Sequence, residues 1–210
     1  FSLSGYTSGT TNKPMIVYRS VFSILHEEYT YKLYLRNCGV PINPRIAVIR
    51  GDKIKSGRDN SPPFWLKMPF TRRLIFSSFH LSSSNAKYYL QKLDDEKPEI
   101  IFAYPSSVTF LARIALEMRW KPTWKFYGVF TSSETFTIED QNLCSLVFGK
   151  VFDHYGQAER VAVLQQCSFH NYHVRDDYSR VEFVEDSHGF KIVGSNYYNT
   201  AMPLVRYDTG

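Results

Sequence analysis

The feature that most constrains the fold of this chain is a regular alternation between short β-rich apolar runs and segments with helical spacing. Residues 45–50, 99–104 and 150–154 are rich in Val, Ile and Phe, and each is followed by a turn or a helical pattern. After Ser106, apolar side chains recur at helical spacing, at Val108, Leu111, Ala112, Ala115 and Leu116. Such alternation predicts an α/β fold with substantial parallel strand pairing.

Local signals place the helices within this pattern. Ser20 is expected to cap a helix that ends near Cys38-Gly39, because serine accepts a hydrogen bond from the first turn and glycine stops a helix. A second helix is expected to be capped within residues 82–84 and to run towards Asp95. These helices and the strands between them predict mixed or parallel sheets flanked by helices.

The end of the chain has a different pattern. Beyond Tyr172 the helical spacing disappears, and the runs 181–184, 190–193 and 204–207 are typical of antiparallel strands. We therefore expect an alternating α/β part over residues 1–165 and a mainly β subregion over residues 166–210 of one partial domain.

Composition narrows the class of protein. The chain has 210 residues, of which 43% are hydrophobic, enough for one substantial core. No apolar run is long enough for a membrane span, so no membrane insertion is expected. The net charge of +5 raises the alternative of nucleic-acid binding. The basic residues are scattered, however, with Arg72-Arg73 the only adjacent pair, which favours a solvated surface and no nucleic-acid partner.

Cysteine usage and the start of the chain indicate the compartment. Cys38, Cys144 and Cys167 are widely spaced and odd in number, which argues against a disulfide framework and favours a reducing cytoplasm. Residue 1 is Phe and the first residues already resemble a functional loop, so we expect no signal peptide and a chain that is part of a longer protein.

Residues 7–14 form a loop rich in hydroxyl groups, with one glycine and one lysine. Hydroxyl and backbone N–H donors beside a lysine suit a polyphosphate. The sequence is not a Walker A motif, because Asn12 precedes Lys13 and no Gly-Lys-Ser/Thr follows. An ordinary polar turn is the alternative reading from composition.

The same loop, TSGTTNKP, resembles the phosphate loop of the acyl-adenylate-forming ligases, TSGTTGKP, at seven of eight positions. The departure is Asn12, a residue type that visits positive φ more easily than most. The resemblance implies that Thr10 and Lys13 take part in catalysis and that the loop binds ATP through Thr7, Ser8, Gly9, Thr10, Thr11 and Lys13.

A second segment, residues 153–160, resembles the YGxTE motif of that superfamily. The resemblance implies a tyrosine stacked near adenine and a catalytic glutamate, Glu159, that holds Mg²⁺. A carboxylate bridging Mg²⁺ to phosphates fits the ion's preference for oxygen ligands. Ala158 replaces the usual hydroxyl residue. The nucleotide-binding residues implied here are His154, Tyr155, Gly156, Gln157 and Glu159.

A third segment, residues 203–210, resembles the RYxTGD motif, whose final aspartate binds ribose and would follow Gly210. Asp208 occupies the variable position and is not assigned that role. Between the motifs, Ser133 and Glu134 resemble the loop that flanks the nucleotide base. A helix N-cap with an acidic first turn is the alternative for them.

Two further groups complete the expected site residues. Phe79, His80 and Tyr104 lie where relatives place the acyl pocket, although a lone histidine is also typical of a structural role. Cys167 and His173 resemble half of a structural zinc site, whose remaining ligands would lie beyond this chain. A buried thiol beside a polar turn is the alternative.

Together the motifs resemble the phenylacetate–CoA ligase branch, closest to the CapK-type proteins of capsular polysaccharide biosynthesis. This implies the central part of the large N-terminal domain of an enzyme that uses ATP and Mg²⁺ to activate a small carboxylic acid as acyl-AMP, followed by thioester formation with CoA. The alternatives are AMP transfer without a thioester and a catalytically degenerate nucleotide-binding protein. The mobile C-terminal domain of relatives is expected to be absent here, leaving this fragment poorly active. The identity of the acid and the oligomeric state stay open.

Overall fold

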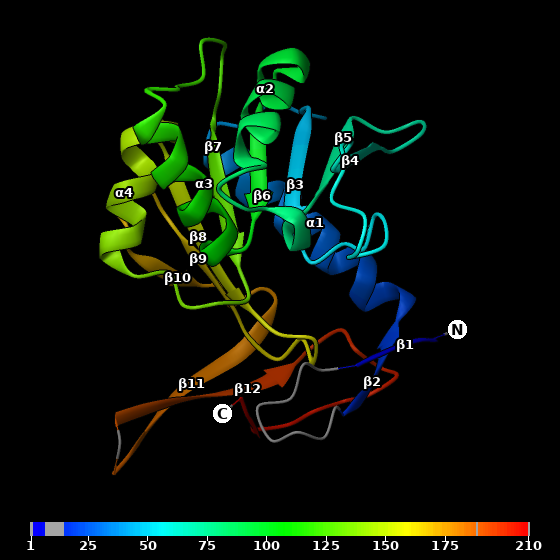
Figure 1. Cartoon of the computed structure of the whole chain (residues 1–210). Helices are drawn as coiled ribbons and strands as arrows, with labels where there is room; N and C mark the ends of the chain where they lie inside the picture. Colours follow the sequence, from blue (N-terminus) through cyan, green and yellow to red (C-terminus); the bar gives the residue numbers. More distant parts are fainter. Residues whose placement is uncertain (1, 7–14, 188, 210) are drawn as a thin grey trace. The chain divides into compact units, whose positions relative to one another are not determined.

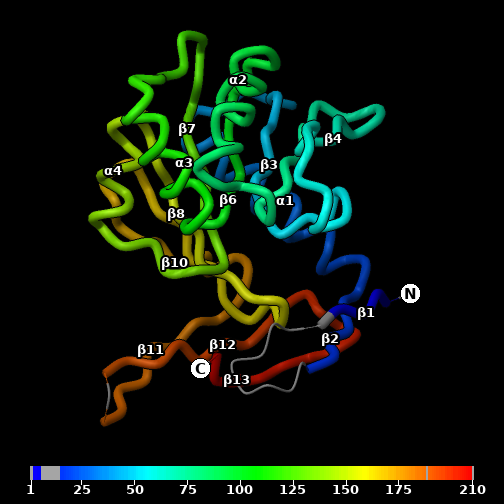
Figure 2. The backbone as a smooth tube through the Cα atoms, viewed as in Figure 1, coloured from blue at the N-terminus to red at the C-terminus, as the bar shows by residue number. Residues whose placement is uncertain are grey.

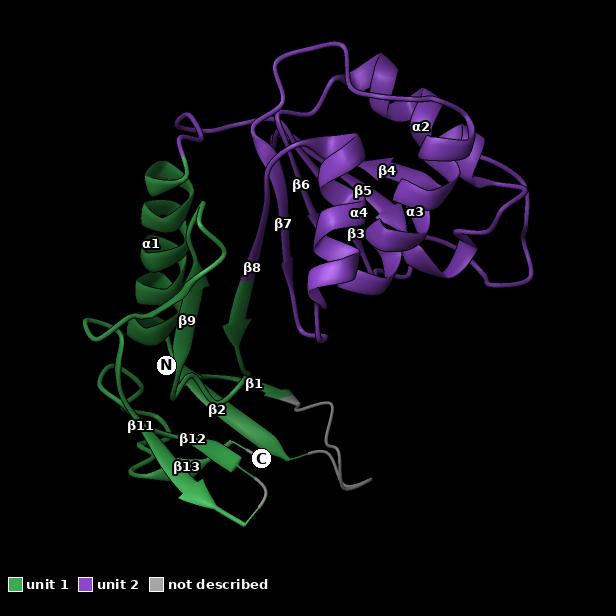
Figure 3. Cartoon of the chain, turned by 90° about the vertical axis from the view of Figure 1, so that its left-hand side faces the viewer, with its two compact units in different colours: residues 1–38, 154–210 green, residues 39–153 purple. Residues whose placement is uncertain are grey.

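The computed structural model describes residues 2–6, 15–187 and 189–209 and divides into two compact units. Unit 1 combines both ends of the chain, residues 1–38 and 154–210, and unit 2 comprises residues 39–153 (Figure 3). Each unit is considered by itself.

Unit 2 is built on a predominantly parallel sheet. Its strands are ordered β8-β7-β6-β3-β5-β4, where β7, β6, β3 and β5 pair in parallel and β4 is antiparallel to β5. Strand β8 begins in unit 2 and ends in unit 1. The bounds are β3 Ile46–Arg50, β4 Trp65–Lys67, β5 Arg73–Ser77, β6 Ile100–Ala103, β7 Gly128–Ser132 and β8 Val151–Gly156. The parallel α/β fold expected from the alternating pattern is confirmed.

Three helices cover one face of this sheet: α2 (Ala86–Glu96), α3 (Pro105–Glu117) and α4 (Ile138–Phe148) (Figure 1). Helix α4 begins at a hydroxyl cap, since the Thr137 side chain accepts a hydrogen bond from the Asp140 N–H at 3.2 Å. The apolar residues of these helices and of the strands beneath them form one buried cluster, which includes Ile49, Phe76, Leu90, Leu111, Val129 and Val147.

Two helix starts differ from the sequence expectation. The N-cap of α2 is Asn85, not a residue within 82–84, because the Ser82 and Ser84 hydroxyls bond each other at 3.0 Å and the Ser82 carbonyl accepts from the Ala86 N–H. Helix α3 begins at Pro105, whose missing N–H and fixed φ suit the first helical position.

Stacked aromatic rings fill the part of the unit 2 core beside β5. The rings of Phe64 and Phe76 lie 5.8 and 5.3 Å from that of Tyr89, and all three side chains are fully buried. The Tyr89 hydroxyl donates to the Ser77 carbonyl at 2.6 Å, which satisfies its one polar group. This contact ties α2 to the end of β5.

Unit 1 contains helix α1 (Val21–Asn37) and three groups of antiparallel strands. The expected cap of α1 is confirmed, because the Ser20 side chain accepts from the Ser23 N–H at 3.2 Å. The end of β8 pairs with β9 and β9 with β10, and Figure 2 traces β11, β12 and β13 near the end of the chain. The bounds are β9 Val163–Gln166, β10 Tyr172–Val174, β11 Ser179–Asp186, β12 Gly189–Asn196 and β13 Tyr207–Asp208. The expected antiparallel region is confirmed.

The N-terminal segment holds a strand that the sequence did not indicate. Strand β1 (Ser2–Tyr6) pairs antiparallel with β2 (Ile16–Ser20), with Ser4 opposite Tyr18 and Tyr6 opposite Ile16. Residues 2–6 and 16–20, which precede and follow the predicted phosphate loop in the sequence, therefore pair with each other. Within the described parts of the chain, no helix combines the length and the hydropathy that crossing a bilayer requires.

Candidate functional site

The topology of unit 2 identifies where a ligand site is expected. From β3 the chain passes to β5 on one side, and then returns to β6 on the other side of β3. In open parallel sheets this reversal of strand order leaves a crevice at the carboxyl ends of the two strands where it occurs, and ligands bind there. For this sheet that point lies between the ends of β3 and β6.

Two aromatic side chains lie beside a glycine at this point. Gly51 follows β3 and Tyr104 follows β6, while Phe79 lies in the short helix η1 (Ser78–His80) after β5. A Cβ atom at Gly51 would lie 3.5 Å from Tyr104 Cε2 and 3.9 Å from Phe79 Cζ. The structure thus brings together two of the three predicted acyl-pocket residues, Phe79 and Tyr104, with the Phe79 ring largely exposed.

The loop after β7 reaches the same edge of the sheet. The Ser132 hydroxyl accepts from Arg50 Nη2 at 2.7 Å and lies 3.3 Å from the Ser133 hydroxyl. Ser133 has φ +76°, in a region that non-glycine residues occupy mainly at special turns. Glu134 Oε2 accepts from the Ser106 N–H at 2.9 Å. Glu134 therefore supports the N-terminus of the preceding helix α3, while α4 is capped by Thr137.

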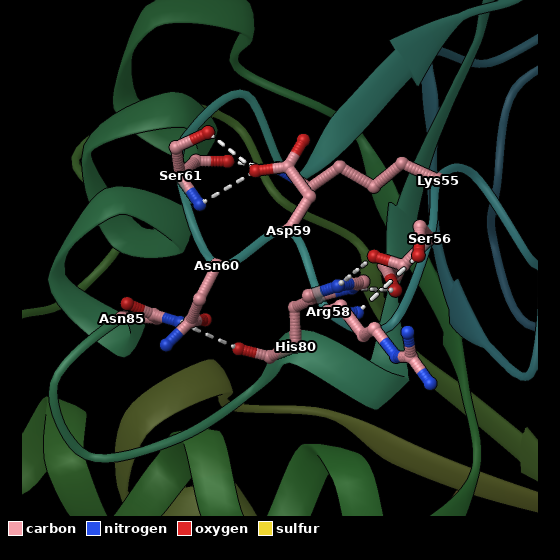
Figure 4. A network of polar contacts seen from close by, with 9 residues as sticks. Lys55, Ser56, Arg58, Asp59, Asn60, Ser61, His80 and Asn85 are labelled. Atoms are coloured by element: carbon pink, nitrogen blue, oxygen red, sulfur yellow. Dashed lines mark hydrogen bonds and ion pairs between the residues drawn. The ribbon is translucent and has the colours of Figure 1, made fainter.

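His80, the third predicted pocket residue, is buried and engaged on both ring nitrogens. Nδ1 lies 2.7 Å from the Ser77 hydroxyl and Nε2 lies 3.2 Å from the Ser56 carbonyl. Figure 4 shows the polar network around it, in which the Asn85 amide donates to Asn60 Oδ1 at 2.8 Å and to the His80 carbonyl at 3.0 Å. His80 thereby ties the loop after β3 to the start of α2.

In unit 1, the end of β8 carries the second predicted motif. A Cβ atom at Gly156 would lie 2.9 Å from His154 Cε1, so a larger residue there would require the His154 ring to shift. The His154 ring lies 5.5 Å from that of Tyr31 and 6.4 Å from that of Tyr34, both on α1. The Gln157 side chain accepts from the Ala162 N–H at 3.3 Å and closes the turn that follows.

The third motif packs directly against the second. The Tyr155 hydroxyl donates to Thr209 Oγ1 at 2.9 Å, and the Thr209 hydroxyl donates in turn to the Ile192 carbonyl at 2.9 Å. The Tyr207 hydroxyl donates to Glu159 Oε1 at 3.2 Å. Burial, and next the Glu159 carboxylate, raise the pKa of Tyr207, so its hydroxyl stays a donor at neutral pH.

Glu159 is a nearly buried carboxylate, 9% exposed, and among the described residues it forms no ion pair. Its neighbour Arg160 has φ +59° and turns away to contact α1, where it pairs with Glu27 and donates to the Ser23 hydroxyl at 3.4 Å. Burial raises the pKa of Glu27, and Arg160 opposes that rise. The turn that holds Glu159 is thereby anchored to α1.

The hairpin between β9 and β10 brings together the two predicted zinc ligands. A hydrogen bond from His173 lowers the pKa of the Cys167 thiol, and the Phe169 N–H adds to this effect. In the described part of the chain, no group of three or more His, Cys, Asp or Glu side chains is placed to hold a metal ion. Zinc binding with further ligands outside this chain stays a prediction. No disulfide joins Cys38, Cys144 and Cys167, which all lie within the described ranges.

The predicted phosphate loop lies outside the described residues, so the structure does not test the assignments of Thr7, Ser8, Gly9, Thr10, Thr11 and Lys13. Sequence reasoning assigned no role to three residues at these sites: Arg50, Tyr207 and Thr209. For Arg50 the available signal was a charged residue that ends an apolar strand. For Tyr207 and Thr209 it was their place inside the third motif.

Comparison with known proteins supports this architecture. No protein-family model matches the chain. Protein CapK of Staphylococcus aureus is 22% identical over 207 residues, which cover 97% of this chain and 46% of CapK. The chain thus spans about half the length of the curated relative it matches.

Solved structures share the fold at low sequence identity. An open conformation of 2-hydroxyisobutyryl-CoA ligase, in complex with 2-HIB-AMP and CoA, has a TM-score of 0.65 at 16% identity, over 99% of this chain and 51% of that one. Apo MbtA of Mycobacterium smegmatis has a TM-score of 0.60 at 11% identity, over 94% and 37%. The anthranilate CoA ligase AuaEII, in complex with anthranoyl-AMP, has a TM-score of 0.59 at 12% identity, over 93% and 39%. The expected resemblance in fold is confirmed.

Proposed function

We propose that this chain, which has the fold of the adenylate-forming ligases and is similar in sequence to CapK, forms the ATP site of an enzyme that activates a carboxylic acid as acyl-AMP. In this proposal it is the central part of the large N-terminal domain. Its site residues come from the phosphate loop, the turn after β8 and the segment around β13.

The meeting of the second and third motifs carries the proposal. Residues 153–160 and 203–210 were each assigned to nucleotide binding by resemblance, and the Tyr155–Thr209 and Tyr207–Glu159 hydrogen bonds join them in unit 1. At a shared binding site, segments that are far apart in the sequence are expected to meet around the same functional group, which here is the Glu159 carboxylate. An isolated surface turn does not require such convergence.

The residues around Glu159 fit a magnesium ion. Mg²⁺ in nucleotide sites is held by one or two carboxylates together with phosphate oxygens and water, so it does not require a cage of protein ligands. Glu159 supplies a hard oxygen donor that is nearly buried and lacks a cationic partner among the described side chains. A buried carboxylate is costly unless a positive charge compensates it. When bound, Mg²⁺ would neutralise charge on the phosphates of ATP.

In the proposed reaction, a carboxylate oxygen of the acid attacks the α-phosphorus of ATP. The new C–O–P linkage forms as the bond to the bridging oxygen breaks and pyrophosphate leaves with that electron pair. The carboxylate is ionised at neutral pH and needs no general base. Catalysis is therefore positioning and charge stabilisation. Lys13 and the loop hydroxyls would hold the phosphates, Tyr155 would stack near the base, and Ser133 and Glu134 would flank it.

Three finer assignments belong to the same proposal. The acyl group passes to CoA as in the phenylacetate–CoA ligase branch, with Phe79 and Tyr104 lining the acyl pocket. The similarity to CapK suggests that the product serves capsular polysaccharide biosynthesis. The lack of a disulfide among the described cysteines, Cys38, Cys144 and Cys167, fits a cytoplasmic location.

ATP titration by calorimetry, with and without Mg²⁺, tests the proposal. We expect Mg²⁺-dependent binding that Glu159→Gln and Lys13→Ala each weaken by about tenfold or more, the scale of one charge-assisted contact. Glu185→Gln, a matched change on an exposed residue of β11, should leave binding unaltered. ATP binding that is absent from the folded protein, or that is indifferent to both Lys13 and Glu159, would contradict the assignment.

The fate of the acyl group is tested separately. With an acid that supports pyrophosphate release, we expect free CoA to fall and an acyl thioester to accumulate in equal amounts. Pyrophosphate release with no loss of CoA, and AMP attached to the acceptor, would favour an AMP-transferring enzyme. ATP binding without pyrophosphate release for any acid would favour a nucleotide-binding protein that has lost catalysis.

A further inference from the structure

A surface pocket of about 190 Å³ lies at the amino-terminal ends of β3 and β5, at the edge of the unit 2 sheet opposite the predicted acyl pocket. It is bounded by the start of β3, the hairpin that joins β4 to β5 and the end of α2. The charged residues of its lining are one carboxylate, Glu96, and four cations: Arg45, Lys67, Arg72 and Arg73. None of these residues belongs to the proposed ATP site.

The positive charge of this pocket exceeds what nearby carboxylates neutralise. Glu96 pairs with Lys92 Nζ at 2.8 Å and with Lys67 Nζ at 3.0 Å, and these hydrogen bonds lower its pKa. Glu99, which is not part of the lining, lies 3.8 Å from Arg72 Nη2. The guanidinium groups of the other two lining arginines have no carboxylate partner within the described ranges. The pocket therefore suits an anion, and the arginine fork matches phosphate oxygens well.

Two strongly exposed apolar side chains flank the same pocket. Phe70, with a relative exposure of 108%, and Ile42, with 83%, are the most exposed of the large apolar side chains that the structure describes. Phe70 lies in the β4–β5 hairpin next to the lining residue Thr71, and Figure 1 shows this hairpin projecting from the sheet. Ile42 precedes Asn43, whose carbonyl accepts a hydrogen bond from Arg72 Nη1 at 2.8 Å. Apolar side chains and positive charge are therefore neighbours at this edge.

Neither the turn nor the core explains a phenylalanine at position 70. Phe70 has φ +58°, a left-handed conformation that favours Gly or Asn and is unusual for a bulky side chain. Its ring is fully exposed, so it adds nothing to the buried core. An apolar ring that is held in water on an unfavourable backbone indicates a binding role.

We propose that this edge of unit 2 docks on the surface of an anionic lipid bilayer. The pocket takes the phosphate group of a lipid, while the side chains of Phe70 and Ile42 lie at the level of the headgroups, where aromatic rings are favoured. Each basic residue near an anionic membrane raises the affinity by about fivefold. A fluid interface closes around protruding side chains of any shape, whereas a protein partner needs a matching hollow for each. This inference goes beyond the proposed function and does not depend on it.

Co-sedimentation of the full-length protein with vesicles tests the role of charge. The vesicles are phosphatidylcholine alone and an equimolar mixture of phosphatidylcholine and phosphatidylglycerol. We expect at least about tenfold tighter binding to the mixture, weakening as salt rises. Lys67→Gln combined with Arg73→Gln should lower affinity for the mixture by about tenfold or more. Lys32→Gln combined with Arg36→Gln removes the same charge from exposed positions of α1 and should retain binding.

A second pair of variants tests the apolar contact. Phe70→Asn removes the ring and keeps a residue type that accepts positive φ, so the turn should persist and Tm should stay close to its original value. We expect this change to weaken binding to the mixed vesicles by about fivefold to tenfold, since the ring no longer leaves water. Phe190→Asn, at a phenylalanine of β12 that is 72% exposed, is the matched control and should retain binding.

Three results would overturn the proposal. The first is that the full-length protein binds neither vesicle, or binds both equally, which would favour an acidic protein partner for this surface. The second is that the variants at the pocket and the hairpin lose no more affinity than their controls. The third is that glycerol phosphate, followed by calorimetry, binds at this pocket while vesicles do not, which would identify a soluble phosphate ester as the ligand.

Discussion

The hydroxyl of Tyr207 donates a hydrogen bond to Oε1 of Glu159 at 3.2 Å, joining residues that lie 48 positions apart in the sequence. One side of the carboxylate is thereby fixed by a phenol whose proton is retained at neutral pH. The hydrogen bond orients the Glu159 side chain. In the proposed enzyme this relationship makes Tyr207 a positioning residue for the carboxylate.

Replacing Tyr207 with phenylalanine tests this role. A single hydrogen bond to a charged group contributes about 1.5–3 kcal/mol, so we expect Tyr207→Phe to weaken Mg²⁺-dependent ATP binding by roughly tenfold to a hundredfold. ATP binding measured without Mg²⁺ should change little, because the effect passes through Glu159. Tyr197→Phe, on an exposed tyrosine of the same unit, is the control. Equal losses with and without Mg²⁺ would show that Tyr207 acts on the nucleotide by another route.

Gly194 allows β12 to approach the turn that carries Glu159. A Cβ atom there would lie 2.7 Å from the carbonyl carbon of Val161, whose backbone lacks the freedom of a side chain to move aside. Gly194→Ala should therefore lower the free energy of unfolding by about 1–3 kcal/mol. Each kcal/mol lost should lower Tm by roughly 2–4 °C for a chain of this size. Gly57→Ala, at a site with open space, should leave Tm nearly unchanged. Thermal unfolding followed by circular dichroism measures both, and equal Tm values would refute the close-approach argument.

His80 should govern the stability of the loop after β3. His80→Phe keeps a buried ring and removes the hydrogen bonds to Ser77 and Ser56, each contributing about 0.5–1.5 kcal/mol. We expect faster hydrogen exchange at the Asp59 amide, which bonds the Ser56 carbonyl at 3.0 Å, with the α4 amides unaffected. Ser56→Ala keeps the carbonyl that accepts from His80 and should leave exchange close to its original rate. Unaltered exchange in His80→Phe would mean that other contacts hold the loop.

The cysteines should differ in reactivity with pH. The hydrogen bond from His173 lowers the pKa of Cys167, whereas burial raises the pKa of Cys144 to about 11. Because only the thiolate is nucleophilic, Cys167 should be alkylated by iodoacetamide at a pH below that of an ordinary thiol, and its rate should fall as pH drops through its lowered pKa. Mass spectrometry should find Cys144 unmodified until the protein unfolds. His173→Gln should move the Cys167 profile to higher pH, and a profile that stays in place would exclude the pairing.

Much of the fold followed from local patterns. The Ser20 cap and the helix from Val21 were predicted because a serine ahead of helical apolar spacing is a strong local signal. The strands β3, β6 and β8 were recognised as β-rich apolar runs followed by turns or helical patterns. Strands of three residues, such as β4 and β10, are too short to give a comparable signal. The N-cap predicted for α2 within residues 82–84 was wrong, because serine hydroxyls that can cap a helix can also hydrogen-bond to each other in a turn.

By itself, the sequence determined the α/β class and the three motifs, because periodicity, caps and consecutive residue types are properties of neighbouring positions. Only the tertiary structure decided which distant residues share a site. It joined residues 1–38 to 154–210 in one unit and placed Tyr207 on Glu159. It also placed Arg50 beside Tyr104 and Ser132, with no carboxylate to pair with it among the described residues. Such contacts depend on strand order and on the direction of each side chain. Both are set by packing between distant segments, so no local sequence pattern predicts them.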